Sequence, residues 1–314
     1  MSGLSKDFDA RIAVYRALRL LFITALSVLA VKIVLFDVVT INSSRMSPSI
    51  MQGDRVLVLR TPYLSLLRNL SKPPIGKPIL FRSVVNSGGF DLLRAVAAGG
   101  DTLRIDSGSV VSTRYIDRVN IPRKKASALV PATYAPRDFF APYSIPCQGE
   151  TLMLNKLPLR EFFLAASMIR QENRVSTVTV KPYLIIEDSV CNDYIITDFA
   201  FYHGRIDSVP ESLGRDWFFW NRLDEYLHQK HGGKRFSLYF TLSIDNTVME
   251  EYIVKERHLF MLADSRDDGF DSRYFGPVSS TAFTGRPVMV LWSRGKDELG
   301  HNKLRFKRFG RFIP

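Results

Sequence analysis

The chain has 314 residues, of which 46% are hydrophobic and 24% are charged, so it is long enough for one large or two modest folded domains. This composition excludes an intrinsically disordered protein. The net charge of +12 and the isoelectric point near 9.7 favour an anionic partner, either nucleic acid or a membrane surface.

No motif for nucleic-acid binding accompanies this charge. The sequence has no zinc-ligand spacing, no helix-turn-helix glycine pattern and no aromatic RNA-binding motif. We therefore expect membrane lipid, and no nucleic acid, as the anionic partner. Apart from His228 and His231, which suit a polar helix end, the histidines are scattered, so we expect no metal and no cofactor.

Residues 17–36 form an apolar run that predicts a transmembrane anchor. About 20 residues cross a hydrocarbon core of about 30 Å, and Lys32 lies close enough to the far end to place its ammonium at the interface. The early basic residues predict a cytoplasmic N-terminus, residues 1–16. A cleavable signal peptide ending near Ala30 is the alternative, but the apolar run continues to Phe36. We expect a single-pass protein of the inner (cytoplasmic) membrane, with its bulk periplasmic or extracellular.

The segments after the anchor are short, rich in aliphatic or β-branched residues, and bounded by turn residues, a pattern typical of strands. They are 36–41, 55–60, 79–82, 92–96 and 102–105, with turns at Gly88-Gly89 and Gly99-Gly100-Asp101. The first half of the exported chain is therefore expected to be mainly β.

Residues 118–246 are expected to form an inserted second lobe, between two parts of a β core at 37–117 and 247–314. The stretch 118–146 is rich in proline and basic residues and has no clear period, which predicts a long surface connection or part of the insertion. Helical spacing at 157–170 and 217–230, and a strand pattern at 236–244, predict mixed α and β structure. The sequence leaves open whether Cys147 and Cys191 form a disulfide.

The C-terminal residues 303–312 interleave cations with phenylalanine and leucine. In one interpretation this segment lies on anionic lipid headgroups, where each basic residue contributes about 1 kcal/mol. In the other it is a solvated strand with one buried apolar face, because Leu304 and Phe306 alternate with Arg305 and Lys307.

Three motifs follow the predicted anchor in order. They are 43–50 (Ser-Ser-Arg-Met-Ser-Pro-Ser-Ile) with Gly53-Asp54 after it, 92–101 (Leu-Leu-Arg-Ala-Val-Ala-Ala-Gly-Gly-Asp), and 263–278, which begins Ala-Asp-Ser-Arg-Asp-Asp-Gly-Phe-Asp-Ser-Arg. In this order they resemble the serine box, the lysine box and the third box of bacterial type I signal peptidases, which are membrane-anchored serine proteases. The resemblance implies a mainly β, signal-peptidase-like antiparallel fold with an N-terminal transmembrane helix and an inserted mixed α+β lobe.

The resemblance places three unsuitable residues at the positions that carry catalysis in this family. Arg45 stands where the family has its nucleophilic serine, Leu93 where it has the general-base lysine, and Gly269 where it has the serine that supports the lysine. A guanidinium has no lone pair to attack with, and leucine cannot accept a proton. We therefore predict that no residue is catalytic.

The other matched positions are expected to keep the scaffold and the groove. Ser43 matches a serine of the oxyanion hole, Met46 and Pro48 match residues that shape the turn and the substrate groove, and Asp271 and Arg273 match a structural charged pair. Arg45 itself must pair with a carboxylate or point to water, because an unpaired buried guanidinium is costly.

The favoured hypothesis is an inactive signal-peptidase-like membrane protein that binds signal peptides, exported polypeptides or an active signal peptidase. The first alternative is an active serine endopeptidase with a displaced nucleophile, Ser44 or Ser47, and Lys77 or His258 as base. The second alternative is a structural or assembly protein of the envelope that needs no groove, so that changes at Met46 leave its role intact.

Overall fold

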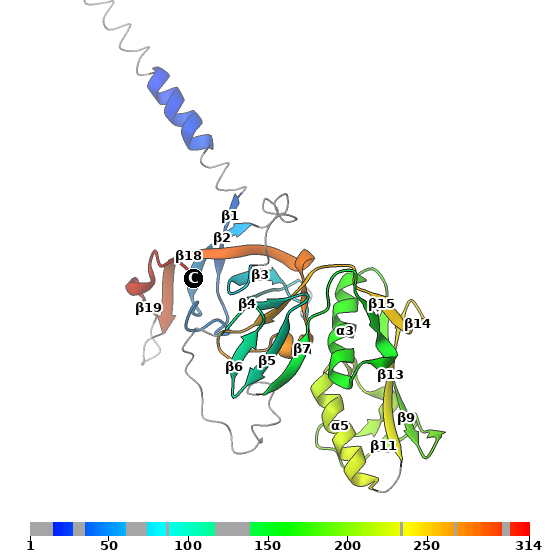
Figure 1. The fold of residues 1–314 in the computed structure, drawn as a ribbon. Helices are drawn as coiled ribbons and strands as arrows, with labels where there is room; N and C mark the ends of the chain where they lie inside the picture. The colour runs from blue at the N-terminus through cyan, green and yellow to red at the C-terminus, as the bar shows by residue number, and fades with distance from the viewer. Residues whose placement is uncertain are drawn as a thin grey trace, which may run out of the picture. The chain divides into compact units, whose positions relative to one another are not determined.

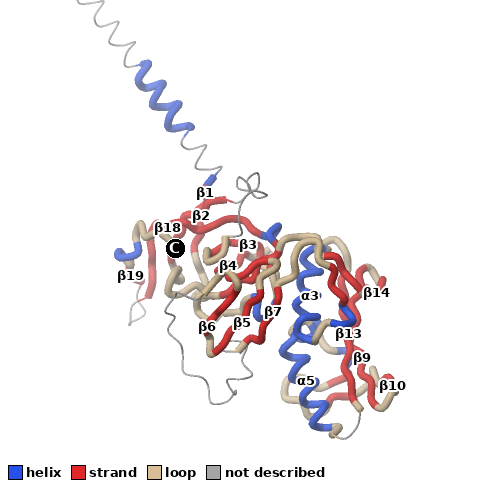
Figure 2. The backbone as a smooth tube through the Cα atoms, viewed as in Figure 1, coloured by secondary structure: helices blue, strands red, loops and turns tan. Residues whose placement is uncertain are grey.

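The computed structural model describes residues 15–27, 35–60, 74–85, 88–116, 139–232, 235–266, 269–296 and 302–314. The chain divides into two compact units. The first draws on Met1–Asn42, Gln52–Ser71 and Thr284–Pro314, and the second on Ser43–Met51 and Lys72–Phe283. Figure 1 and Figure 2 show that strands predominate between the predicted anchor and the C-terminus. The strand pairings within each unit are antiparallel, which agrees with the mainly β fold expected from the sequence.

The described part of the predicted anchor is helical over residues 15–27, and residues 28–34 of the predicted span lie outside the described residues. Within the described residues, no helix is both long enough and apolar enough to span a bilayer. Residues 1–14 of the predicted cytoplasmic segment also lie outside the described part of the chain.

In the first unit, β1 (Phe36–Thr40), β2 (Asp54–Arg60), β18 (Phe283–Lys296) and β19 (Asn302–Leu304) pair in that order. The turn before β2 requires glycine, because Gly53 has φ +86° and an added Cβ would lie 1.8 Å from the Arg294 carbonyl oxygen. Next to it, the Asp54 carboxylate is fully buried and receives the Arg308 guanidinium at 2.5 Å.

This ion pair tests the second interpretation of the C-terminal segment, whereas contact with lipid stays a prediction. Arg308, in a short 3₁₀ turn (Phe306–Arg308), is buried on Asp54, whereas Leu304 and Phe306 are 40% and 70% exposed. The interpretation as a strand with a buried apolar face is therefore wrong, because the buried carboxylate draws a cation inward and the alternation breaks after residue 304.

The second unit contains a sheet in the order β3 (Pro78–Arg82), β4 (Phe90–Ala98), β16 (His258–Leu262), β17 (Val278–Ser279). A second sheet has the order β6 (Ser109–Ser112), β5 (Thr102–Asp106), β7 (Phe140–Ser144). The buried face of β4 carries Leu93 and Ala95 into a core shared with Phe81 and Met261. Short helix α6 (Ser272–Phe275) follows the third box motif.

Strand β7 differs from the surface connection expected for 118–146, of which 118–138 lie outside the described residues. Phe140 and Tyr143 bury their rings against Phe260, with ring centroids 5.7 and 5.9 Å apart. Because β7 is an edge strand, Pro142 removes no hydrogen bond from an inner strand of the sheet.

The remainder of the second unit is a lobe with its own hydrophobic core, built from residues between Leu152 and Val254. Its helices are α3 (Leu159–Glu172), α4 (Glu211–Gly214) and α5 (Trp217–Lys230), and its largest sheet has the order β10 (Ser189–Val190), β9 (Val178–Ile186), β13 (Phe236–Ile244), β14 (Thr247–Met249). Two smaller strand pairs complete the lobe: β8 (Thr151–Met153) with β15 (Glu251–Ile253), and β11 (Ile195–Ile196) with β12 (Gly204–Arg205). Two 3₁₀ turns of the lobe are at Leu154–Lys156 and Ile206–Ser208, and a third, outside the lobe, follows β17 at Ser280–Ala282.

Local sequence signals account for the start of one helix and for one tight turn of the lobe. Asp216 caps α5 by accepting the Phe218 N–H at 2.9 Å, and Asp245-Asn246, with φ of 48° and 67°, make the tight turn between β13 and β14.

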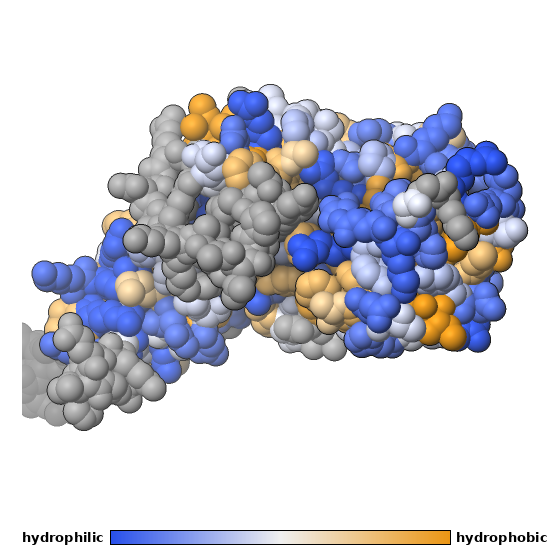
Figure 3. Space-filling model, turned by 90° about the horizontal axis from the view of Figure 1, so that it is seen from below, coloured by the Kyte–Doolittle hydropathy of each residue, from blue (hydrophilic) through white to orange (hydrophobic). Residues whose placement is uncertain are grey.

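Figure 3 shows mainly hydrophilic residues on the face that it displays, with hydrophobic residues in small separate groups. Cys147 and Cys191 are free thiols.

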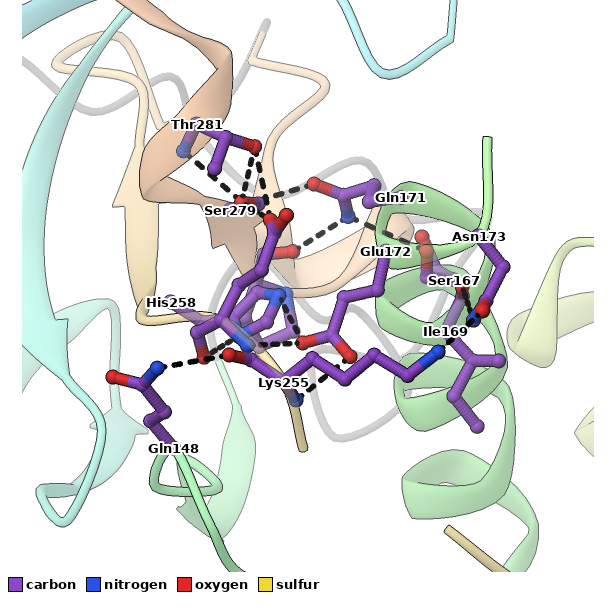
Figure 4. A network of polar contacts seen from close by, with 12 residues as sticks. Gln148, Ser167, Ile169, Gln171, Glu172, Asn173, Lys255, His258, Ser279 and Thr281 are labelled. Carbon is purple, nitrogen blue, oxygen red and sulfur yellow. Dashed lines mark hydrogen bonds and ion pairs between the residues drawn. The ribbon is translucent and has the colours of Figure 1, made fainter. Parts of the chain in front are cut away.

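A buried polar network joins α3 to β16 and β17 (Figure 4). The Glu172 carboxylate accepts the backbone N–H groups of Lys255 and Glu256, each at 2.9 Å, and lies 3.5 Å from Nε2 of His258. The ring of His258 is buried, and burial lowers its pKa more strongly than Glu172 raises it. This network therefore ties α3 of the lobe to β16 and β17.

Candidate functional site

The serine box motif forms a compact turn in the second unit. The N–H of Ser47 donates to the Ser44 carbonyl at 2.9 Å, and the N–H of Ile50 donates to the Met46 carbonyl at 2.8 Å. Met46 is 2% exposed and packs inward, whereas Pro48 lies on the surface.

Ser43 is exposed, and its hydroxyl oxygen accepts the backbone N–H of Arg45 at 3.2 Å. An oxyanion hole needs donors that point at the developing oxyanion. Here the amide of the residue at the nucleophile position is turned onto Ser43 instead.

Arg45 forms an ion pair. Its Nη1 lies 2.6 Å from Oδ1 of Asp91 on β4, and the two side chains are 30% and 14% exposed. Its backbone carbonyl accepts the N–H of Ser265, from the third box, at 2.8 Å. Arg45 is thus held by a carboxylate on β4 and by a backbone hydrogen bond from the third box.

Leu93 is completely buried and belongs to the apolar core of the sheet, where β4 pairs it with Ile79 of β3. Asp91 lies two residues earlier on the same strand, so both side chains project to the same face. A lysine at position 93 would bury an ammonium among Phe81, Met261 and other apolar side chains.

Gly269 leaves no space for the supporting serine. A Cβ built at this position would lie 2.2 Å from the Cβ of Ala263 and 2.9 Å from the Ser265 carbonyl oxygen. A serine fits only if the backbone of the third box moves. The backbone, and not the side chain alone, has therefore diverged from what a serine at this position requires.

The third box is held by the charged pair named in the sequence analysis. Nε and Nη2 of Arg273 each lie 2.8 Å from a carboxylate oxygen of Asp271, and both side chains are fully buried. Asp271 also accepts the Ala263 N–H at 3.0 Å, and Arg273 donates to the Gly269 carbonyl at 3.3 Å. This bidentate pair fixes the loop that contains Gly269.

A second buried pair, not singled out in the sequence analysis, joins all three motifs. Arg94 donates to Asp264 through Nε and Nη2, both at 2.7 Å, and its Nη2 also reaches the Ser49 hydroxyl at 3.2 Å. Ser49, Arg94 and Asp264 belong to the first, second and third motif. The signal that could have found them is the presence of an arginine and an aspartate within apolar stretches, because buried charges are paired.

Asp91 was also missed, although a carboxylate two residues before Leu93 on a predicted strand is visible in the sequence. No group of three metal-ligating side chains that could hold an ion occurs among the described residues.

A sequence model of the family described as "Signal peptidase, peptidase S26" matches residues 14–134 and 218–292, which is more than half of the chain. The chain belongs to this family. Signal peptidase I of Aquifex aeolicus (strain VF5) is 23% identical over 273 residues, which cover 87% of this chain and 82% of that protein. The match to the family leaves out residues 135–217, which include α3, β9 and α4.

Proposed function

We propose that this member of the signal peptidase family binds signal peptides or exported polypeptides and does not cleave them. The observation that carries the proposal is the Arg45–Asp91 ion pair at the position of the family's nucleophile. In well-studied serine proteases, losing one nucleophile or base lowers kcat by roughly a millionfold.

The surroundings support loss of activity at the other two positions. Leu93 is buried in an apolar core, and the Cβ contacts at Gly269 exclude a serine without movement of the backbone. Changing Arg45 alone would therefore not restore a working dyad.

The alternative of a displaced nucleophile finds little support in the hydrogen bonds. Among the described residues, neither Ser44 nor Ser47 has a side-chain hydrogen bond to Lys77 or His258. His258 instead lies 3.0 Å through Nδ1 from the Glu256 carbonyl oxygen, and its ring faces the Glu172 carboxylate, as Figure 4 shows. A serine hydroxyl without a base in reach remains a weak nucleophile. Modification of the native chain by a serine-reactive reagent would favour this alternative.

We further propose that the protein is held at the inner membrane by residues 17–36 as a single-pass anchor, with the N-terminus in the cytoplasm. Its net charge of +12 favours anionic lipid headgroups. In the first unit, Phe306 and Phe312 are 70% and 77% exposed beside Lys307 and Arg311, a combination that suits a lipid interface. An active signal peptidase in the same membrane is a further candidate partner.

Binding is tested with the full-length protein in detergent and a fluorescein-labelled synthetic signal peptide, followed by anisotropy and by mass spectrometry of the peptide. We expect saturable binding and an intact peptide after prolonged incubation. Arg45→Ala should weaken binding several-fold, whereas Arg235→Ala, which changes an exposed arginine 84% open to solvent, should not. Absence of binding by folded protein would instead support the structural or assembly role.

A further inference from the structure

A cavity of about 870 Å³ lies within the second unit, separate from the Arg45–Asp91 pair. Its walls come from the β3–β4 hairpin, from α3 and α4, and from the third box around Phe270 and Tyr274. The α3 and α4 walls belong to the stretch that the family match leaves out, whereas the other walls belong to the matched part. The cavity therefore lies between elements inside the family match and elements outside it.

Positive charge exceeds negative charge in the described lining of the cavity. Four arginines line it, and they are Arg82, Arg170, Arg174 and Arg215; the carboxylates are Glu211 and Asp216. Glu211 is paired with Arg215 at 2.5 Å, and Asp216 caps α5. Arg174 hydrogen-bonds only neutral groups, the Gln171 carbonyl at 3.0 Å and the Thr281 hydroxyl at 3.2 Å.

Arg170 is half-buried, whereas the other three arginines of the cavity are exposed. Its Nε is buried and has no hydrogen-bond partner among the described residues. Burial, followed by the nearby Arg215, lowers its pKa to about 10. The Glu211 carboxylate opposes this shift, but it is already paired with Arg215, so the cations of the cavity outnumber its carboxylates.

Aromatic rings line the cavity together with the arginines, and they would contact an apolar part of a ligand. Phe90 is 60% exposed and Phe270 is 43% exposed, and Phe270 stacks on Tyr274 with ring centroids 5.2 Å apart. The cavity is within the size range of sites that enclose drug-sized ligands, and far larger than one phosphate ion. Arginine recognises carboxylates through two parallel hydrogen bonds.

We propose that this cavity binds an acidic segment of a polypeptide, with a glutamate or aspartate carboxylate on Arg170 and Arg82 and a neighbouring apolar side chain on Phe90 and Phe270. The proposal depends neither on cleavage nor on the proposed binding of signal peptides, because Arg45, Leu93 and Gly269 do not line the cavity. It gives the chain a way to select one class of partner by charge.

The test uses the full-length protein in detergent and two fluorescein-labelled hexapeptides, one with two glutamates beside a phenylalanine and the other with glutamines in their place. We expect the glutamate peptide to bind at least tenfold more tightly. Arg170→Gln should weaken this binding at least tenfold and Arg82→Gln about threefold, whereas the matched exposed change Arg235→Gln should leave it unaltered. Thermal unfolding of each variant confirms folding, and Arg82, which is exposed, decides the matter if Arg170→Gln does not fold.

Equal binding of the two peptides, or no effect of Arg170→Gln and Arg82→Gln on binding by folded protein, would overturn the proposal. So would displacement of the glutamate peptide by millimolar inorganic phosphate, which would make this a phosphate site. Failure of a signal peptide to bind in the separate experiment would leave this result unchanged, so the two proposals fail independently.

Discussion

At the level of single residues, the Arg45–Asp91 ion pair connects the serine box motif to β4. The side chains are only 30% and 14% exposed, so removing either partner leaves a partly buried charge. We expect Arg45→Ala and Asp91→Ala each to lower the free energy of unfolding by about 1–3 kcal/mol. The double variant should lose less than the sum, with a coupling of about 1 kcal/mol.

Urea unfolding of the native chain, the two single variants and the double variant, followed by tryptophan fluorescence, measures this coupling. The pair Arg235–Asp188 is the matched control, because its side chains are 84% and 76% exposed. The control pair should show a coupling near zero. Strict additivity at Arg45 and Asp91 would show that the ion pair does not hold the site.

Gly269 yields a second prediction at this scale. Because an added Cβ would lie 2.2 Å from the Ala263 Cβ, Gly269→Ser should destabilise the protein by about 1–3 kcal/mol. The control is Gly232→Ser, since Gly232 is exposed and its nearest neighbour, the Gln229 carbonyl oxygen, lies 3.8 Å from the added Cβ. Equal unfolding midpoints in urea for the two variants would mean that the third box accepts the serine, and the divergence would then be confined to side chains.

At the level of the elements, the sequence predicts much of the fold because local patterns and burial agree. The helix predicted at 217–230 is α5, with a capping aspartate before it, and the strand predicted at 236–244 is β13. The predicted helix at 157–170 lies at 159–172, after Pro158.

Tertiary contacts account for the elements that the sequence did not reveal. Strand β7 was missed because its proline and charged neighbours hide two rings that become buried only against Phe260. Strand β9 was also missed, because no turn signal as clear as Asp245-Asn246 precedes it in the sequence. The partner of Arg45 was missed because its identity depends on where β4 passes the serine box motif, which no local pattern specifies.

The network between α3 and β16 gives a prediction about pH. Burial keeps the pKa of His258 below its ordinary value of 6.5, so the unfolded chain takes up a proton that the folded chain does not. Stability from this residue is therefore complete above about pH 6.5, the unfolded pKa, and falls as the pH drops below it. We expect His258→Gln to show a smaller loss of stability than the native chain between pH 7.5 and pH 5.5.

Urea midpoints at the two pH values provide the measurement. His228→Gln is the control, because His228 is exposed at the end of α5 and should leave the native pH dependence in place. A His258→Gln variant with the same pH dependence as the native chain would contradict the assignment of a neutral, buried histidine to this network.

At the level of the whole molecule, buried ion pairs connect the three motifs that match the family. Buried pairs such as Arg94–Asp264 and Arg273–Asp271 keep the three motifs together, and they are independent of whether the protein is a protease. Arg45 forms an ion pair, Leu93 belongs to the apolar core, and Gly269 has no space for a larger side chain, so these three positions contribute to stability as well. The proposed loss of cleavage rests on these positions, and the arginine-lined cavity carries a separate proposal.

The most direct test is preprotein cleavage by the purified full-length chain in detergent, measured beside an active signal peptidase and beside the double variant Arg45→Ser with Leu93→Lys. We predict no mature product from the native chain at any pH, under conditions in which the active enzyme processes the preprotein completely. Cleavage by the native chain that disappears on changing Ser44 or Ser47 to alanine would contradict the account and identify a displaced catalytic serine.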